Sequence, residues 1–272
     1  MNKKTQQKLL NIVKNGYEQN ADEFSDSRNY IWPELCAVIA RSIDERSDVK
    51  ATKQSRDASN VATLTGLSRS VANAPSLAMT VLDLGCGNGR LFELFRDTYT
   101  KYIGIDQSHN LIKLAQKKYP KAKFIQGDVL NINKITDNKY DLILLIAVLP
   151  HIPSHELRLE LLKNIKNILS AGRNSYGCSD QQNNSKLIIT CWNLRARLKY
   201  KKLIWKYNIL KIFGLNQMDW GDILFSGFNK KSARYYHAFT KKELQKLLEQ
   251  AGFNIEKIYN DQKNIYAICI LK

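Results

Sequence analysis

The spacing of apolar residues predicts helices at the start of the chain and alternating strands and helices further on. Residues 5–21 repeat apolar side chains with the period of an amphipathic helix. A second helix is predicted to follow the sequence FSDSRNYIWPEL and to end near Ile43. The next residues, 44–76, are polar and contain few large apolar side chains, so they predict a surface loop or an insertion.

Short apolar runs then alternate with helical patterns. Ser108 and Ser154 stand where helix N-caps are expected, and the residues around Leu91 also predict a helix. Strands separated by helices at this spacing predict a parallel sheet with right-handed crossovers. The predicted strands contain the sequences TVLDLG, YIGID, AKFIQGD, YDLILLIAV and KLIITCW. Thr240 and Glu243 predict a capped helix, which two closing strands, FNIEKIY and NIYAICILK, follow.

The composition favours a globular protein with a polyanionic partner. The 272 residues are 44% hydrophobic and 10% aromatic, which suits one large domain or a domain with an insertion. The formal net charge is +17, an excess that phosphate contacts with a nucleic acid would use. A generally basic proteome or a solubility adaptation is the alternative explanation of this charge.

Several classes of protein are not indicated. The five cysteines are odd in number, scattered and without a CxxC pair, so neither a disulfide framework nor a metal site is expected. The N-terminal residues lack the apolar core of a signal peptide, and no apolar run approaches the roughly 20 residues of a membrane span. We therefore expect a cytoplasmic protein without stable membrane insertion.

The sequence VLDLGCGNGR brings three glycines and one carboxylate together after the first predicted strand. Gly85, Gly87 and Gly89 permit positive φ and leave no Cβ in the way of a ligand. The dinucleotide fingerprint has its third glycine one residue later, where Arg90 stands here. Asp83 would repel a pyrophosphate but suits a ligand that carries an ammonium group. The turn therefore favours a cationic ligand over a dinucleotide.

Two further carboxylates end the next two predicted strands. Asp106 can accept hydrogen bonds from both hydroxyls of a ribose, and Asp128 is placed to accept one from an adenine amino group. An ammonium group, a ribose and an adenine together describe S-adenosylmethionine, which we predict as the cofactor. The neighbouring residues assigned to the same site are Cys86, Gln107, Val129 and Ile146.

These residues, in this order, resemble those of the class I S-adenosylmethionine-dependent methyltransferases. The resemblance covers residues 80–192 and the closing strands. It implies an α/β, Rossmann-like, doubly wound sheet of seven mostly parallel strands, with the last strand antiparallel to the rest. It also implies a methyl-transferring enzyme, although the glycine turn does not identify the acceptor. A cofactor-binding RNA protein without activity is the non-enzymatic alternative, and the intact carboxylates Asp83, Asp106 and Asp128 argue against it.

Three stretches outside the glycine turn resemble the tRNA wobble-uridine carboxymethyl methyltransferases of the Trm9 and ALKBH8 type. They are an Arg before Trp-Pro at 28–33, the sequence AVLPH at 147–151 and the sequence RYYH at 234–237. The resemblance implies methyl esterification of 5-carboxymethyluridine in the anticodon region of tRNA. Pro150 departs from the family's His-His pair, so only His151 is carried over. Eukaryotic members work with a small Trm112-type activator subunit, which is therefore a candidate partner.

The same stretches supply candidate residues for a carboxylate acceptor, which is already nucleophilic and needs a cationic clamp rather than a base. Arg28 and Arg234 can orient the carboxylate, and His151 can add a hydrogen-bond donor. Each of these side chains has an ordinary packing or ion-pair role as its alternative. The residues assigned to a flipped uracil are Trp192, Tyr235, Tyr236 and His237.

The predictions divide the chain into three parts. Residues 1–43 form helices that cover the active site, 44–76 form the polar insertion, and 77–272 form the methyltransferase domain. Residues 193–233 within that domain are a basic helical insertion after strand five, since no acidic residue lies between positions 181 and 218. We favour a lid that grips RNA, with a membrane-surface helix or a simple packed lid as alternatives. A methyltransferase for a small-molecule or lipid-linked acceptor is the alternative function.

Overall fold

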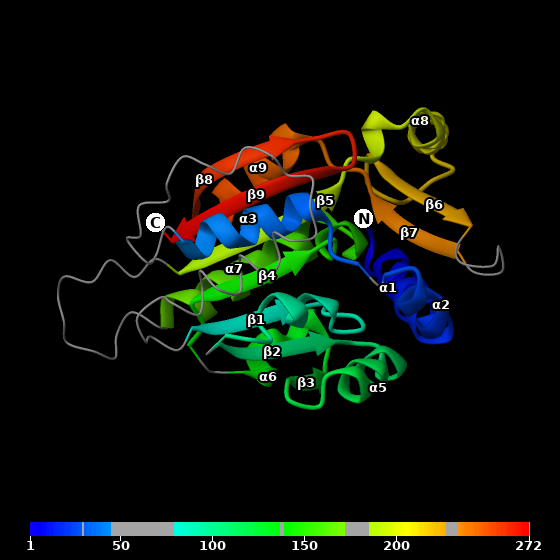
Figure 1. The fold of residues 1–272 in the computed structure, drawn as a ribbon. Helices are drawn as coiled ribbons and strands as arrows, with labels where there is room; N and C mark the ends of the chain where they lie inside the picture. Colours follow the sequence, from blue (N-terminus) through cyan, green and yellow to red (C-terminus); the bar gives the residue numbers. More distant parts are fainter. Residues whose placement is uncertain are drawn as a thin grey trace.

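A computed structural model describes residues 1–28, 30–44, 79–98, 100–136, 139–171, 185–226 and 233–271. The described residues form a seven-stranded sheet with helices on both faces and a separate two-stranded sheet (Figure 1). The predicted polar segment 44–76 lies outside them, apart from its first position.

The main sheet has the strand order β3-β2-β1-β4-β5-β9-β8 (Figure 1). β1 to β5 pair in parallel, whereas β9 is antiparallel to both β5 and β8. This topology confirms the predicted fold, with its seven strands and its antiparallel last strand. The strands are β1 (Thr80–Leu84), β2 (Lys101–Asp106), β3 (Lys123–Gln126), β4 (Leu142–Ile146), β5 (Lys186–Trp192), β8 (Phe253–Asn260) and β9 (Asn264–Leu271).

Helices cover both faces of this sheet because successive side chains of each strand point to opposite faces. In β1, Leu82 and Leu84 belong to the same apolar cluster as α6, α7 and α9, whereas Val81 packs with α3 and α5. Burial on both faces explains the unbroken apolar runs of β4 and β5. The helices are α3 (Pro33–Asp44), α5 (His109–Lys118), α6 (Ile132–Ile135), α7 (His155–Ala171) and α9 (Lys241–Gln250).

The predicted helix starts have the expected caps. Ser108 Oγ accepts a hydrogen bond from the backbone N–H three residues on at 3.2 Å, and Ser154 Oγ does the same at 3.3 Å. Thr240 and Glu243 form the predicted capping box of α9. Each cap satisfies a backbone N–H that the first helical turn leaves open.

The prediction of an α-helix directly after the glycine turn is wrong. Residues Arg90–Leu94 form only a short 3₁₀ helix, η1. Phe92 in η1 and Phe95 directly after it both turn into the core, where their ring centroids lie 5.4 and 5.8 Å from that of Tyr102. Residues three apart lie on one side of a 3₁₀ helix, so this short element buries both rings against the same neighbour.

The segment between β5 and β8 holds a helix and the second sheet before α9. Helix α8 (Leu198–Ile212) follows a 3₁₀ turn, η5 (Leu194–Ala196). Strand β6 (Asp222–Ser226) then pairs antiparallel with β7 (Ala233–His237). The sequence predicts the basic helix but neither of these strands. Like the other helices in the described part of the chain, α8 is not long and apolar enough to cross a membrane.

The N-terminal helices α1 (Lys3–Gln19) and α2 (Ala21–Asp26) connect the two sheets. Leu9 of α1 belongs to the apolar cluster that contains Tyr235 of β7. At the other end of α1, Glu18 Oε2 accepts a hydrogen bond from the hydroxyl of Ser108 at 2.7 Å. The two helices thereby lie next to the carboxyl ends of the parallel strands, where α/β sheets bind their ligands.

Candidate active site

The glycine turn after β1 lines a pocket at the carboxyl edge of the main sheet. Gly85 and Gly87 have φ values of 71° and 57°, a left-handed region that favours glycine. A Cβ on Gly85 would lie 2.3 Å from Val148 Cγ2, and one on Gly87 would lie 3.1 Å from Phe24 Cε1. Backbone conformation and close neighbours therefore both require glycine at these two positions.

Asp83, Asp106 and Asp128 all line this pocket. Asp106 Oδ2 accepts a hydrogen bond from Gly87 N and its Oδ1 one from Ser108 N, both at 2.9 Å. Asp128 Oδ1 accepts one from the backbone N–H two residues on at 3.0 Å. Each carboxylate oxygen can accept a further hydrogen bond, so both side chains can still bind the hydroxyl or amino group of a ligand.

Asp83 is the most deeply buried of the three carboxyls, with 1% of its surface exposed. Burial raises the pKa of Asp83 to about 7, although the hydroxyl of Tyr102 donates to it and the charge of Arg90 lowers the value. A cation bound beside Asp83 would favour the ionised form, so the position suits an ammonium group. Burial also lowers the pKa of Arg90 to about 10, and the charge of Arg28 adds to this effect.

Helices α1 and α2 supply the side of the pocket that faces the glycine turn. Asn88 Nδ2 in the turn donates a hydrogen bond to Ser25 Oγ of α2 at 3.0 Å, which holds the two elements together. The sequence predicts that residues 1–43 cover the active site, but it does not identify which of their side chains line the pocket. The pocket residues from this part of the chain that the sequence did not identify are Leu10, Val13, Tyr17, Phe24 and Trp32.

Arg28, His151 and Trp192 line the same pocket beyond the glycine turn. The Cζ of Arg28 lies 5.6 Å from the ring centroid of Trp192 and 5.5 Å from that of Phe24. Contacts with ring faces orient a guanidinium while leaving most of its N–H donors available. One donor reaches the carbonyl oxygen of Ser27 at 3.4 Å. The arrangement can therefore bind a planar anion beside an aromatic surface.

His151 is a neutral imidazole in a fixed orientation. Its Nδ1 lies 3.2 Å from the carbonyl oxygen of Tyr235, and its Nε2 lies 2.9 Å from the hydroxyl of Tyr17. A carbonyl oxygen only accepts, so Nδ1 carries the proton and Nε2 accepts from Tyr17. Burial, together with the charges of Arg234 and Arg28, lowers the pKa of His151 to about 3. The prediction that His151 donates to the acceptor is corrected accordingly, because Nε2 is an acceptor.

Comparison with known proteins identifies the domain. Residues 81–172 match the family model described as "Methyltransferase domain". The tRNA (carboxymethyluridine(34)-5-O)-methyltransferase of Schizosaccharomyces pombe is 27% identical over 198 residues, which are 69% of this chain and 78% of that protein. A trans-aconitate 2-methyltransferase of Rhodopseudomonas palustris is 31% identical over 103 residues, 37% of each chain. A crystal structure of a SAM-dependent methyltransferase from Methanosarcina mazei, 22% identical, has a TM-score of 0.56 and covers 72% of this chain and 95% of that one.

Residues 81–172 thus belong to a class I S-adenosylmethionine-dependent methyltransferase domain, and the solved structure shares its fold. The pocket of this methyltransferase fits its cofactor by the chemistry of its donors. Asp83 can bind an ammonium group, Asp106 a ribose diol and Asp128 an adenine amino group. The remaining residues that the sequence assigned to the cofactor and that line the pocket are Gly85, Cys86, Gly87, Gln107, Val129 and Ile146.

Gly89 is the one predicted cofactor residue of the methyltransferase that does not line the pocket. Its φ is 73°, and a Cβ there would lie 2.6 Å from Cζ of Phe124. The positive φ and this neighbour show that the glycine lets the turn pack against β3, and its cofactor contact stays a prediction.

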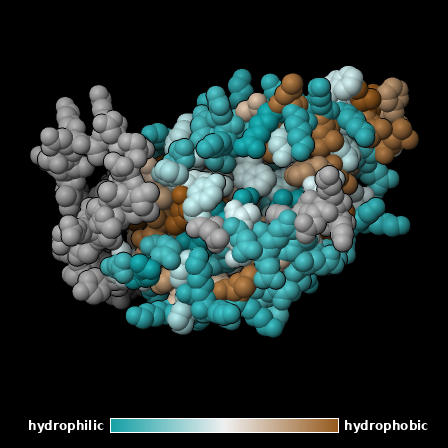
Figure 2. Space-filling view, turned by 45° about the vertical axis from the view of Figure 1, so that its right-hand side comes forward, coloured by the Kyte–Doolittle hydropathy of each residue, from teal (hydrophilic) through white to brown (hydrophobic). Residues whose placement is uncertain are grey.

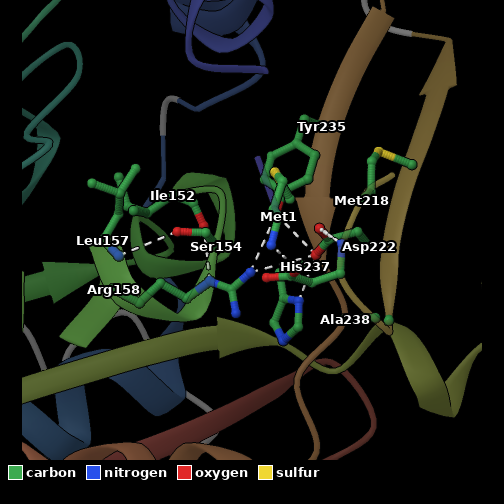
Figure 3. Close-up of polar contacts among 12 residues, drawn as sticks. Met1, Ile152, Ser154, Leu157, Arg158, Met218, Asp222, Tyr235, His237 and Ala238 are labelled. Carbon is green, nitrogen blue, oxygen red and sulfur yellow. Dashed lines mark hydrogen bonds and ion pairs between the residues drawn. The ribbon is translucent and has the colours of Figure 1, made fainter. Parts of the chain in front are cut away.

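Strand β7 of the methyltransferase directs two predicted substrate residues into a buried network (Figure 3). The hydroxyl of Tyr235 donates to Asp222 Oδ1 at 2.9 Å, and His237 Nδ1 lies 2.7 Å from the same oxygen. Neither side chain is more than 1% exposed. The structure does not bring Tyr235 and His237 to the pocket, so the prediction that they contact substrate is corrected.

Tyr236 and Arg234 pack against residues that line the pocket. The ring of Tyr236 stacks between Trp192 and Phe225, with centroids 4.9 and 5.0 Å apart. The Cζ of Arg234 lies 5.8 Å from the ring centroids of both Tyr17 and Tyr236. Trp192 and Tyr17, which these side chains contact, line the pocket, so the predicted direct contacts of Tyr236 and Arg234 with an acceptor stay predictions.

The buried network connects the loop after β4 to β6 and β7 (Figure 3). Arg158 Nε donates to the carbonyl oxygen of Ile152 at 2.8 Å, and its Nη2 lies 3.4 Å from Asp222 Oδ1. Ile152 lines the pocket, and the carbonyl of Tyr235 accepts from His151. The network therefore positions residues on two sides of the pocket without entering it.

Proposed function

We propose that this methyltransferase esterifies the carboxylate of a 5-carboxymethyl uridine at the wobble position of tRNA. The fission yeast relative is named for that substrate and aligns over 69% of this chain. The net charge of +17 suits a polyanionic substrate. The bacterial relative is named for trans-aconitate, which is also a carboxylic acid. A small acid is therefore the second candidate acceptor.

The observation that carries this proposal is the position of Arg28 beside Trp192 in the pocket. A guanidinium can bind a carboxylate through two parallel hydrogen bonds, and an indole face can stack on a pyrimidine. Trp192 is half-buried, and the ring of Tyr236 supports it from behind. Arg28 would thus bind the carboxylate, which plain uracil lacks. Trp192 would stack on the pyrimidine ring, which a small acid lacks.

The pocket chemistry needs no general base for this reaction. The bound donor supplies an electrophilic methyl group on its sulfonium. A carboxylate is ionised at neutral pH, so the chain has to align it and exclude water. His151 is neutral and hydrogen-bonded to Tyr17, and burial raises the pKa of Tyr17. Both side chains therefore stay uncharged and form an aromatic lining around the acceptor.

The test is transfer of labelled methyl groups from S-adenosylmethionine to tRNA that carries 5-carboxymethyluridine, followed by nucleoside mapping. A Trm112-type activator subunit is included in parallel reactions, since the resemblance proposes one as a partner. Label in the methyl ester of the wobble nucleoside is the expected result. Label found only on small carboxylic acids, with or without the activator, would contradict the tRNA assignment and favour the second candidate.

A pair of arginine variants separates the loss of acceptor binding from the general effect of removing one positive charge. Arg28→Ala removes the clamp, and we expect kcat/KM for tRNA to fall about 100-fold, because a charge-assisted bidentate contact is lost. Donor affinity, measured by calorimetry, should change less than about threefold. Arg96→Ala makes the same charge change at a side chain that is 55% exposed, and it should leave both quantities nearly unchanged.

A further inference from the structure

Helix α8 has apolar side chains on two opposite sides, and the protein covers only one of them. Leu198, Trp205 and Ile212 recur every seventh residue, so they lie on one side of the helix. They are 68%, 69% and 68% exposed. The side chains of the opposite, covered side pack with Ile223 and Tyr236, and they are Tyr200, Leu203, Ile204 and Tyr207. The outer side is thus not needed to hold α8 on the domain.

The exposed apolar surface continues beyond the end of the helix. Six of the seven large hydrophobic side chains that are exposed in the described part of the chain lie between residues 198 and 220. In the space-filling view, hydrophobic side chains gather at the upper right, in the part of the molecule that α8 forms (Figure 2). Apolar side chains concentrated in this way mark an interaction surface. We call them the outer stripe: Leu198, Trp205, Ile212, Phe213, Leu215 and Trp220.

Lysines border the outer stripe on both sides. At 100° per residue, Lys201 lies on one side of the line from Leu198 to Ile212, and Lys206 lies on the other. Both are exposed, and no acidic residue occurs between positions 181 and 218. The surface is therefore apolar along its middle and cationic along its edges.

We propose that α8 binds the surface of an anionic lipid bilayer, an interaction that goes beyond the proposed methyl transfer. The outer stripe enters the boundary between headgroups and acyl chains, and the bordering lysines contact lipid phosphates and carboxylates. A nucleic acid would satisfy the lysines and stack on the indoles, but it offers no apolar environment to Leu198, Ile212 or Leu215. A bilayer surface complements both the charge and the aliphatic side chains. Binding is peripheral, because α8 is too short and polar to span.

The test is co-sedimentation of the full chain with vesicles of phosphatidylcholine that contain phosphatidylserine, without tRNA or methyl donor. We expect binding that weakens with salt and a blue shift of tryptophan emission. A protein with a net charge of +17 adheres to anionic vesicles through charge alone. A variant that keeps this charge but removes apolar side chains therefore tests the contribution of the outer stripe. Trp205→Ser with Ile212→Ser should weaken vesicle binding at least about tenfold, since two apolar side chains no longer leave water.

Charge variants complete the design. Lys201→Gln with Lys206→Gln should weaken binding about 30-fold, and Lys113→Gln with Lys117→Gln, the same charge change on α5, should weaken it much less. Circular dichroism and thermal unfolding establish that each variant is folded. If the serine variant binds vesicles as well as the original chain does, the proposal is wrong. If it keeps vesicle binding but loses tRNA binding on filters, the outer stripe binds RNA instead. Because the vesicle assays contain neither tRNA nor methyl donor, their failure leaves the esterification test unaffected.

Discussion

The hydroxyl of Tyr17 donates a hydrogen bond to Nε2 of His151 at 2.9 Å. The two residues are 134 positions apart in sequence, and the bond joins helix α1 to the loop after β4 within the pocket. His151 is also tied to β7 through the carbonyl of Tyr235. One imidazole thus connects three segments of the chain, which gives the N-terminal helices a part in shaping the acceptor side of the pocket.

Removing the Tyr17 hydroxyl should therefore cost both stability and turnover. Tyr17→Phe leaves the buried Nε2 of His151 without its donor, and a buried acceptor without a partner costs about 1–3 kcal/mol. We expect the free energy of unfolding, measured in urea, to fall within that range and kcat to fall with it. Tyr30→Phe is the matched control, because Tyr30 is 63% exposed and should change stability by less than about 0.5 kcal/mol. Equal effects of the two variants would contradict this role of Tyr17.

As pH rises and Asp83 ionises, the stability of the fold should fall, whereas the affinity for the cationic donor should rise. The pKa of Asp83 is raised by burial from 3.8 to about 7. A raised pKa in the folded state means that this carboxyl favours folding at low pH and that the contribution is lost as pH rises from about 4 to about 7. An asparagine cannot ionise, so Asp83→Asn avoids the destabilisation that accompanies ionisation of the carboxyl. Above pH 7 the variant should therefore unfold at the same or a higher urea concentration than the original chain. Its affinity for S-adenosylmethionine should fall about 100-fold, because the ammonium group loses its partner.

Binding of the donor at pH 7 should release protons from the same carboxyl. About half of the Asp83 side chains are protonated at a pH equal to their pKa of about 7, and an adjacent ammonium group lowers that pKa. We expect a release of about half a proton per donor bound, a number that follows from the Henderson relation for that pKa. Calorimetry in buffers of different ionisation enthalpy measures it. Asp83→Asn should abolish the release, and an unchanged value in that variant would place the titrating group elsewhere.

The cofactor side of the pocket could be predicted from sequence because its geometry is local. Asp83, Asp106 and Asp128 end consecutive parallel strands, and the carboxyl ends of such strands meet at one edge of a sheet. Each strand was visible as an apolar run, so the order of the carboxylates along the chain was enough to bring them together. The same reasoning predicts that Gly85 and Gly87 line the pocket beside these carboxylates, as the structure shows. It does not predict the close approach of Gly89 to Phe124, because that contact is made across the fold.

The acceptor side could not be predicted in the same way, since it depends on long-range packing. The sequence RYYH indicates contacts with the acceptor, but it does not reveal that these residues form a strand. Successive side chains of a strand point to opposite sides, so they cannot all face the pocket. Tyr235 and His237 therefore turn to Asp222, whereas Tyr236 turns to Trp192. For Tyr17, the apolar repeat of residues 5–21 predicts only a place in an amphipathic helix. Its apolar spacing indicated burial and carried no sign of the bond to His151.

Two glycine substitutions separate steric contact from backbone strain. Gly89 and Gly214 have nearly the same positive φ, 73° and 70°. A Cβ on Gly89 would overlap the ring of Phe124 at 2.6 Å, whereas one on Gly214 would meet no atom within 4 Å. Gly214→Ala should lower the free energy of unfolding by about 1 kcal/mol through strain alone. Gly89→Ala should lower it by about 2–4 kcal/mol, because overpacking is added. Urea unfolding measures both, and equal losses would mean that Phe124 moves aside freely.

The buried network around Asp222 should control stability and acceptor turnover but not donor binding. Asp222 is fully buried and lies 3.4 Å from Arg158 Nη2 and 2.7 Å from His237 Nδ1. Asp222→Asn leaves the buried charge of Arg158 without its carboxylate, which costs about 3–5 kcal/mol. We expect the free energy of unfolding to fall by that amount. Glu93→Gln removes a carboxylate from an exposed pair with Arg96 and should cost less than about 1 kcal/mol.

The same variant distinguishes a positioning role from a purely structural one. The network holds β7, whose Tyr235 carbonyl orients His151. At a temperature where Asp222→Asn remains folded, kcat for the acceptor should therefore fall about tenfold or more, while the dissociation constant of the donor stays within about threefold. Reduced stability with unchanged kcat would show that the network only holds the second sheet in place. A parallel loss of donor affinity would show that it also shapes the glycine turn.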